Sequence, residues 1–188
     1  VLGNSENGIL IDGDSLNTQV GGVIPLGNVA AGNKPNGIYV TDTVSGFVTF
    51  NTFGGLFPFQ GAAPNGNDGI LIDSTGGNNL IRTNVFSGNL NNGIEIAGNA
   101  SNNVIADSAI GTNIQELAAL AGTAGGVLVS TTGTGNVVGS PQTGWTPLPS
   151  PAVSHNVISG NTGPGVTLAA GTNFNAVINN YIGLNILA

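Results

Sequence analysis

Acid–base chemistry in this chain would depend on very few residues, because only two of its 188 residues are basic and nine are acidic. Asp12 and Asp73 are catalytic candidates, since each stands four residues after a glycine that opens an apolar run. Arg82 and Asp107 are a second candidate pair, either as an acid–base couple or as a surface ion pair that stabilises the chain little. Carboxylates about 6.5–9.5 Å apart hydrolyse glycosidic bonds with inversion. Cleavage of sugar chains is therefore the reaction that these residues would perform.

Calcium is the metal that the sequence could hold. Asp12, Asp14 and Asn17 offer closely spaced oxygen ligands, although the bidentate glutamate that ends a calcium loop is missing. The same residue types are common in ordinary turns. The chain has no Cys and a single His, so thiolate and transition-metal sites are not expected. We expect no cofactor, with calcium as the one alternative.

Aromatic side chains in loops could stack on sugar rings. Phe57 and Phe59 lie in a glycine-rich insert, and Trp145 lies among prolines that favour an extended, exposed loop. Alternatively, the phenylalanines fold back and cover apolar surface, since large apolar side chains are usually buried. These three residues are the candidates for ligand binding.

A sixfold repeat must position these residues. The motif Asn-Val-x-x-Gly-Asn-x-x-x-Gly-[Ile/Val]-x-[Ile/Val/Leu] occurs at 28–40, 84–96 and 156–168, and its second half occurs three more times. A second short run follows about ten residues later in most units, and a third run completes each unit. The glycines that anchor the units are 29, 32, 24, 33 and 39 residues apart: Gly8, Gly37, Gly69, Gly93, Gly126 and Gly165.

These units predict a stack of coils. Runs of three to five residues with apolar residues at alternate positions indicate short strands. One coil cannot bury its apolar face alone, whereas stacked coils bury a continuous column. Asn residues at equivalent turns can then form ladders spaced about 4.8 Å apart. We predict an all-β, right-handed parallel β-helix of about six coils, each with three short strands and with loop inserts at the corners.

The ends of the sequence and the inserts add three expectations. Val1 and Ala188 both fall inside the repeat, so we expect residues 1–188 to form a single β-helix domain that is a segment of a longer repeat protein. The inserts at 55–66 and 113–125 both follow a third strand, so they should project on the same side of the helix. Residues 115–121 are expected to form a helical turn with Glu116 near its start.

The stack also sets the distance between the catalytic candidates Asp12 and Asp73. Two coils would separate them by about 10 Å, just beyond the range of an inverting glycosidase pair.

The Asn-Val-Ile-Ser-Gly-Asn blocks, the Gly-Val-x-Leu strands and the Ile-Gly-Thr-Asn segment at 110–113 resemble a known repeat. They are similar to the right-handed parallel β-helices of the pectin-lyase-like fold, found in bacterial secreted and surface proteins. The resemblance runs from Asn7 to Asn185. It implies an extracellular or cell-surface location in bacteria, but no single activity, because the fold hosts lyases, hydrolases, epimerases, tailspikes and adhesins. The sequence signatures of polygalacturonases and of mannuronan epimerases are absent from this chain.

The outward positions of the first strands include four large apolar residues, Leu10, Tyr39, Leu71 and Leu128. A solvent-facing strip of this kind is unusual in a free monomer. Either a loop covers it or it contacts another chain or domain. We favour an interface, formed by self-association or by further repeats of the same chain.

The charge and hydropathy of the chain limit the classes of partner that it could bind. Two basic residues and a net charge of −7 cannot support nucleic-acid binding, and no stretch approaches the roughly 20 apolar residues of a membrane span. The expected partner is a polysaccharide or a protein surface. Two functions stay open: an extracellular or cell-surface structural or adhesive module whose loops contact glycan or protein, and a polysaccharide-active lyase, hydrolase or epimerase, or its inactive glycan-binding relative. We favour the module, and two carboxylates converging in a groove beside an aromatic residue would favour the enzyme.

Overall fold

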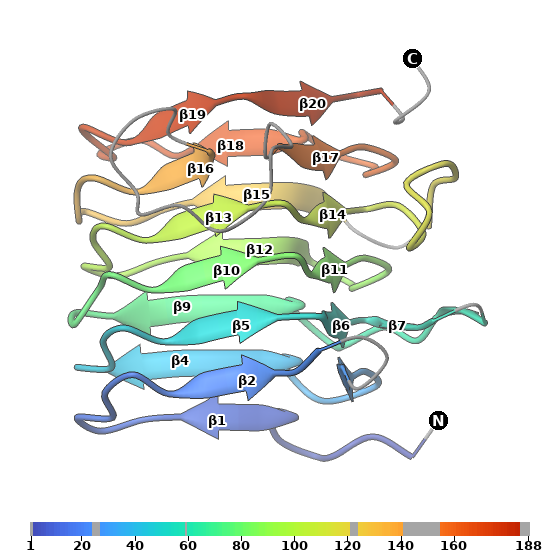
Figure 1. Ribbon diagram of the computed structural model, residues 1–188, viewed down its shortest axis with the longest axis horizontal. Coiled ribbons are helices and arrows are strands. Elements are labelled where there is room, and N and C mark those ends of the chain that lie inside the picture. Colours follow the sequence, from blue (N-terminus) through green and yellow to red (C-terminus); the bar gives the residue numbers. More distant parts are fainter. Residues whose placement is uncertain (1, 24–26, 59, 121–123, 141–154, 185–188) are drawn as a thin grey trace.

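The chain folds into a right-handed parallel β-helix of six coils, as the repeat predicts (Figure 1). The structure is a computed structural model that describes residues 2–23, 27–58, 60–120, 124–140 and 155–184. Each coil contributes one short strand to each of three parallel, six-stranded sheets. In the described part of the chain there is no helix long and apolar enough to cross a membrane.

The strands follow one another in the same order in every coil. The first sheet contains β1 (Ile9–Ile11), β4 (Ile38–Asp42), β9 (Ile70–Ser74), β12 (Asn92–Ile96), β15 (Gly125–Val129) and β18 (Val166–Leu168). The second sheet contains β2 (Gln19–Gly21), β5 (Val48–Phe50), β10 (Leu80–Arg82), β13 (Val104–Ala106), β16 (Val137–Gly139) and β19 (Ala176–Ile178). The third sheet contains β3 (Asn28–Ala30), β6 (Thr52–Gly54), β11 (Val85–Phe86), β14 (Ala109–Ile110), β17 (Asn156–Ile158) and β20 (Asn180–Ile182).

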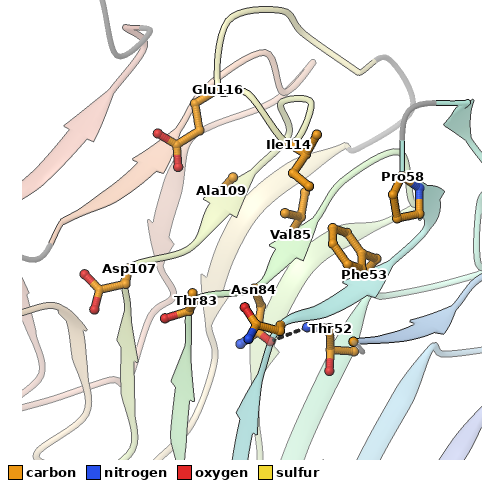
Figure 2. A pocket seen from close by; sticks show the side chains of 12 residues that line it. Thr52, Phe53, Pro58, Thr83, Asn84, Val85, Asp107, Ala109, Ile114 and Glu116 are labelled. Carbon is orange, nitrogen blue, oxygen red and sulfur yellow. Dashed lines mark hydrogen bonds between the residues drawn. The ribbon is translucent and has the colours of Figure 1, made fainter. Parts of the chain in front are cut away.

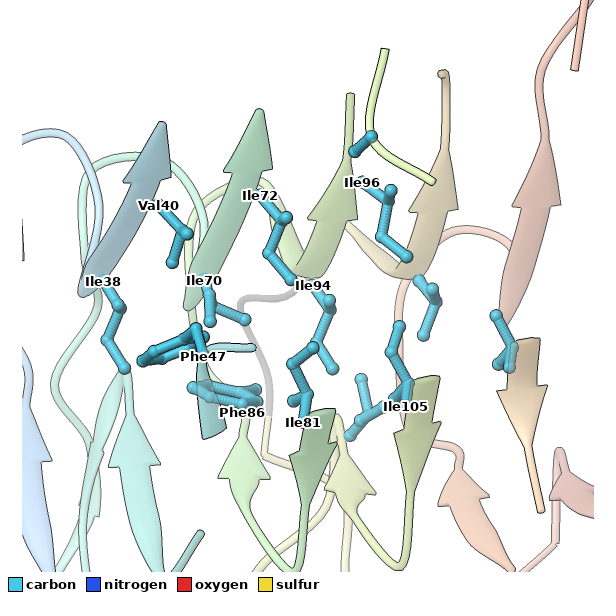
Figure 3. Packing of buried hydrophobic residues seen from close by; sticks show 14 of the residues in the cluster. Ile38, Val40, Phe47, Ile70, Ile72, Ile81, Phe86, Ile94, Ile96 and Ile105 are labelled. Carbon is cyan, nitrogen blue, oxygen red and sulfur yellow. The ribbon is translucent and has the colours of Figure 1, made fainter. Parts of the chain in front are cut away.

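A continuous apolar column fills the helix interior (Figure 3). Alternate residues of each first-sheet strand point inward, so Ile70 and Ile72 of β9 are fully buried and pack on their counterparts in the neighbouring coils. Phe47 and Phe86 fill the space between the sheets and are also fully buried. Each such side chain contributes roughly 1.5–3 kcal/mol when it leaves water, so stacking supplies the stability that one coil lacks.

Asparagine ladders run along the stack at the turns, as the sequence predicts. Nδ2 of Asn79 donates to Oδ1 of Asn103 at 2.8 Å, and Asn103 donates in the same way to Asn136. All three side chains are buried. A parallel row links Asn33 to Asn65 and Asn65 to Asn89. Because these amides bond each other and the backbone, they need no catalytic explanation.

The two inserts that follow third strands project on the same side of the helix, as predicted, and both border the third sheet. The first contains the antiparallel hairpin β7 (Leu56–Phe57) and β8 (Gly61–Ala62). The second does not contain the helical turn expected at 115–121, whose described part runs to residue 120. Oδ1 of Asn113 instead accepts the backbone N–H groups of Leu117 and Ala118, at 3.0 and 3.2 Å. An Asn side chain that bonds nearby backbone in this way competes with helix formation.

Candidate functional site

The outer face of the third sheet carries a row of apolar side chains. In register along the stack these are Val29, Phe53, Val85, Ala109, Val157 and Tyr181. They alternate with inward residues such as Phe86, which belongs to the core. Val29 and Tyr181, at the two ends, are each 43% exposed, whereas Val85 and Ala109, in the middle, are buried. Something therefore covers the centre of the row.

The two inserts provide that cover. Leu56 of the hairpin is buried and forms a small cluster with Val85 and Ala109, against which Ile114 and Leu120 of the second insert also pack. The cover is incomplete, and a groove of about 420 Å³ opens over the row (Figure 2). Its apolar lining comes from Phe53, Pro58, Val85, Ala109 and Ile114. Leu56 therefore folds back over apolar surface, whereas its neighbour Phe57, one of the two phenylalanine candidates, is 37% exposed.

Two carboxylates line the same groove, Asp107 and Glu116. Both flank β14, whereas Phe53 lies on β6, two coils away. Asp107 is the first of the two residues between β13 and β14, where its φ of 51° is left-handed. Glu116 belongs to the second insert. Neither carboxylate accepts a hydrogen bond from any described residue.

Glu116 is partly withdrawn from water. Burial raises the pKa of its carboxyl, and the nearby His155 offsets part of that rise. The His155 ring packs on Tyr181, with ring centroids 4.2 Å apart. Glu116 therefore lies between the groove and the aromatic end of the third-sheet row.

The other catalytic candidates lie away from the groove lining. In the first sheet Thr41 pairs with Asp73, and the same register continues from Ile11 and Val40 to place Asp12 beside Thr41. Asp12 and Asp73 thus share a row two coils apart, and neither lines the groove. Arg82 pairs with Ala106 rather than with Asp107. No ion pair links Arg82 to Asp107, although the structure describes both residues.

The calcium candidates form an exposed turn. Asp12 and Asp14 are exposed, the backbone O of Asp12 accepts a hydrogen bond from Ser15 Oγ, and Asn17 has a left-handed φ of 53°. Oδ2 of Asp42 accepts the N–H of Gly13 from the adjacent coil. Within the described ranges, no group of three or more His, Cys, Asp or Glu side chains could hold a metal ion. The calcium site stays a prediction.

The aromatic and interface candidates fall at different places. Phe57 is 37% exposed at the tip of the hairpin, and Phe59 and Trp145 lie outside the described residues. The strip predicted on the first sheet is in register along the stack. Leu10 is 53% exposed and the others are half-buried, and Glu95 interrupts the strip between Leu71 and Leu128.

Among the residues that line the groove, Asp107 alone was a sequence candidate, and the two that matter most to the chemistry of the groove, Phe53 and Glu116, were not. Phe53 could have been found by extending the inward–outward alternation from the first strands to the third. Predicting the position of Glu116 would have required knowledge of the path of an insert that does not follow the repeat. Comparisons with protein-family models, curated proteins and solved structures found no match to this chain.

Proposed function

We propose that this chain is an extracellular or cell-surface adhesive module of a bacterial β-helix protein, and that it binds a glycan in the third-sheet groove. The observation that carries the proposal is the groove itself, a partly covered apolar row on a rigid repeat. The resemblance of the repeat to secreted and surface β-helices supports the location.

The shape of the groove suits a sugar chain. Its lining reaches from β6 across β11 to β14, two strand spacings, or about 10 Å, along the helix axis. Its volume of about 420 Å³ lies within the roughly 300–1,000 Å³ of ligand pockets. Phe53 and the aliphatic residues beside it offer an apolar surface for the C–H faces of sugar rings. The sheet beneath is fixed by its neighbours, so little ordering is required on binding.

A polysaccharide-active enzyme is the second candidate, and one observation favours it. Asp107 and Glu116 line one groove together with Phe53, and the raised pKa of Glu116 is the property that a general acid needs. Against this, the criterion of carboxylates converging beside an aromatic residue is met only in part, because both carboxylates lie at the β14 end of the groove whereas Phe53 lies on β6, two coils away. We therefore favour binding without turnover.

The test is a panel of plant, algal and bacterial polysaccharides, with calcium or with a chelator, scored for binding and for the release of reducing or unsaturated ends. Ala109→Leu places a larger side chain in the groove floor. Ala97→Leu makes the same change at a half-buried position after β12, outside the groove lining. Binding that is lost in the first variant and kept in the second supports the proposal.

Two other results would contradict the proposal. If no polysaccharide binds, the module does not recognise glycans. If chain ends are released, and Glu116→Gln abolishes that release, the protein is the enzyme instead.

A further inference from the structure

The groove offers a ligand few neutral polar groups. Its floor is the face of a parallel sheet, whose backbone groups are already paired between β6, β11 and β14. Oδ1 of Asn84 accepts the N–H of Thr52 at 3.1 Å, and its Nδ2 donates to the carbonyl of Thr49 at 3.0 Å. Oγ1 of Thr52 donates to the carbonyl of Phe50 at 3.4 Å. These side chains are committed to the fold rather than to a ligand.

The carboxylates of Asp107 and Glu116 are the charged groups of the lining, and the exposed hydroxyl of Thr83 and Oδ1 of Asn51 are neutral polar groups beside them. The two carboxylates accept no hydrogen bond from the described residues, and no Lys or Arg is among the residues that line the groove. The whole chain has only two basic residues and a net charge of −7. The carboxylates would repel an anionic ligand. A ligand with a cationic group next to an apolar ring face would match both the carboxylates and the apolar side chains of the lining.

We infer that the groove selects a cationic amino glycan, a chain of amino sugars with free ammonium groups. This inference rests on the proposed function and names the class of glycan. An ammonium group lies against Asp107 and Glu116, and the C–H faces of the following rings pack on Val85, Ile114 and Phe53. Charged hydrogen bonds of this kind strengthen binding by roughly tenfold or more each.

A cationic peptide has the same charge but fits this surface less well. Extended peptides bind sheets by pairing with an open strand edge, whereas the groove lies over the face of β6, β11 and β14, and each of these strands is already paired on both sides. A sugar chain needs no such backbone pairing. Polyuronates carry the wrong charge, and neutral glycans leave both carboxylates without a partner.

The decisive ligands are matched oligomers of glucosamine and of N-acetylglucosamine. They share the sugar ring and the linkage, but the amino group is a charged ammonium in the first and a neutral acetamide in the second. Calorimetry on the whole chain should show glucosamine oligomers binding at least about tenfold more tightly, with an affinity that falls as salt rises. Polygalacturonate and an oligolysine of similar charge complete the panel.

Three variants locate the effect. Asp107→Asn keeps the turn, because Asn adopts left-handed φ readily, and Glu116→Gln keeps the shape of the side chain. Each should weaken binding of the glucosamine oligomer by about tenfold. Glu6→Gln removes the same unit of charge from an exposed position outside the groove lining and should leave affinity unchanged.

The inference is overturned if acetylated and free oligomers bind equally, if polygalacturonate binds more tightly, or if the groove variants bind as well as the native chain. Tighter binding of oligolysine, lost in Ala109→Leu, would replace it with a peptide partner. A neutral or acidic glycan that Ala109→Leu excludes would overturn the inference while the proposed function stands. If no glycan binds at all, both fail.

Discussion

The outer faces of the first and third sheets have the same strand geometry but differ in how far their rows of apolar side chains are covered. Each carries six side chains in register, mostly apolar, one from each coil. The inserts that contain Leu56 and Ile114 follow third strands, so they pass over the third sheet and bury the middle of its row. The row on the first sheet stays half-buried, with Leu10 exposed. The repeat therefore builds the fold, and the inserts make one of two similar faces into a groove.

The two faces also hold their carboxylates differently. Beside the first sheet, Oδ1 of Asp68 accepts the N–H of Asn92 at 2.8 Å and Oδ2 accepts Nδ2 of Asn67 at 2.9 Å, while Glu95 accepts the hydroxyl of Ser130. Beside the third sheet, Asp107 and Glu116 accept no such bonds from the described residues. Asp68 continues an asparagine ladder and Glu95 is bonded to the next coil, whereas the second pair has no hydrogen bond to the described residues.

The largest expected effect on stability comes from truncating Leu56, the hairpin side chain that covers the middle of the third-sheet row. Leu56→Ala should destabilise the protein by about 2–4 kcal/mol, because it empties a buried site against Val85 and Ala109. Leu71→Ala makes the same change on the uncovered, half-buried row and should cost about 1 kcal/mol or less. Urea unfolding of both variants measures the difference. Equal losses would mean that the two faces are equally packed and that the comparison is wrong.

The next largest expected effect is a pH dependence of the free energy of unfolding, caused by Asp68. Burial raises the pKa of Asp68 from 3.8 to about 6, against the hydrogen bond from Asn92 that lowers it. The folded state thus favours the neutral carboxyl. The stability that this group contributes is fully present below pH 4 and is lost as the pH rises through about 6, on the order of 3 kcal/mol in all.

Asp68→Asn should remove this dependence. Asn stays neutral, and its amide can donate to Asn36 as Asn36 donates to Asn7 at 3.0 Å in the adjoining coil. The variant should therefore gain stability relative to the native chain between pH 4.5 and pH 7.5, as measured by urea unfolding. Profiles that run parallel across this range would show that Asp68 titrates normally in the fold.

The sequence predicted most of this fold and part of the site, for physical reasons. Glycine anchors and alternating apolar residues define strands locally, and the equivalent positions of two inserts placed them on one side. The site depended on where the inserts come to rest, which is set by long-range packing such as that of Leu56 on Val85. A helical turn was expected at residues 115–121, whereas the side chain of Asn113 holds this loop, which carries Glu116, by accepting backbone N–H groups. Asp107 was a sequence candidate, but with Arg82 as its partner instead of Glu116.

The smallest effect tests whether the two carboxylate pairs are independent. The charge of Glu95 contributes to the raised pKa of Asp68, after burial, which is the larger cause. Glu95→Gln should therefore shift the midpoint of the pH profile downward and add less than about 1 kcal/mol of stability at pH 7.5. The raised pKa of Glu116 also contributes to the pH profile of stability, so the pKa of the Asp68 carboxyl itself is followed by NMR titration. Glu116→Gln, the same substitution in the groove, should leave the pKa of Asp68 unchanged because Glu116 contributes nothing to it. An Asp68 pKa that moves in both variants would mean that the two faces are coupled through the stack, and substitutions in the groove would then have to be read as changes in the whole helix.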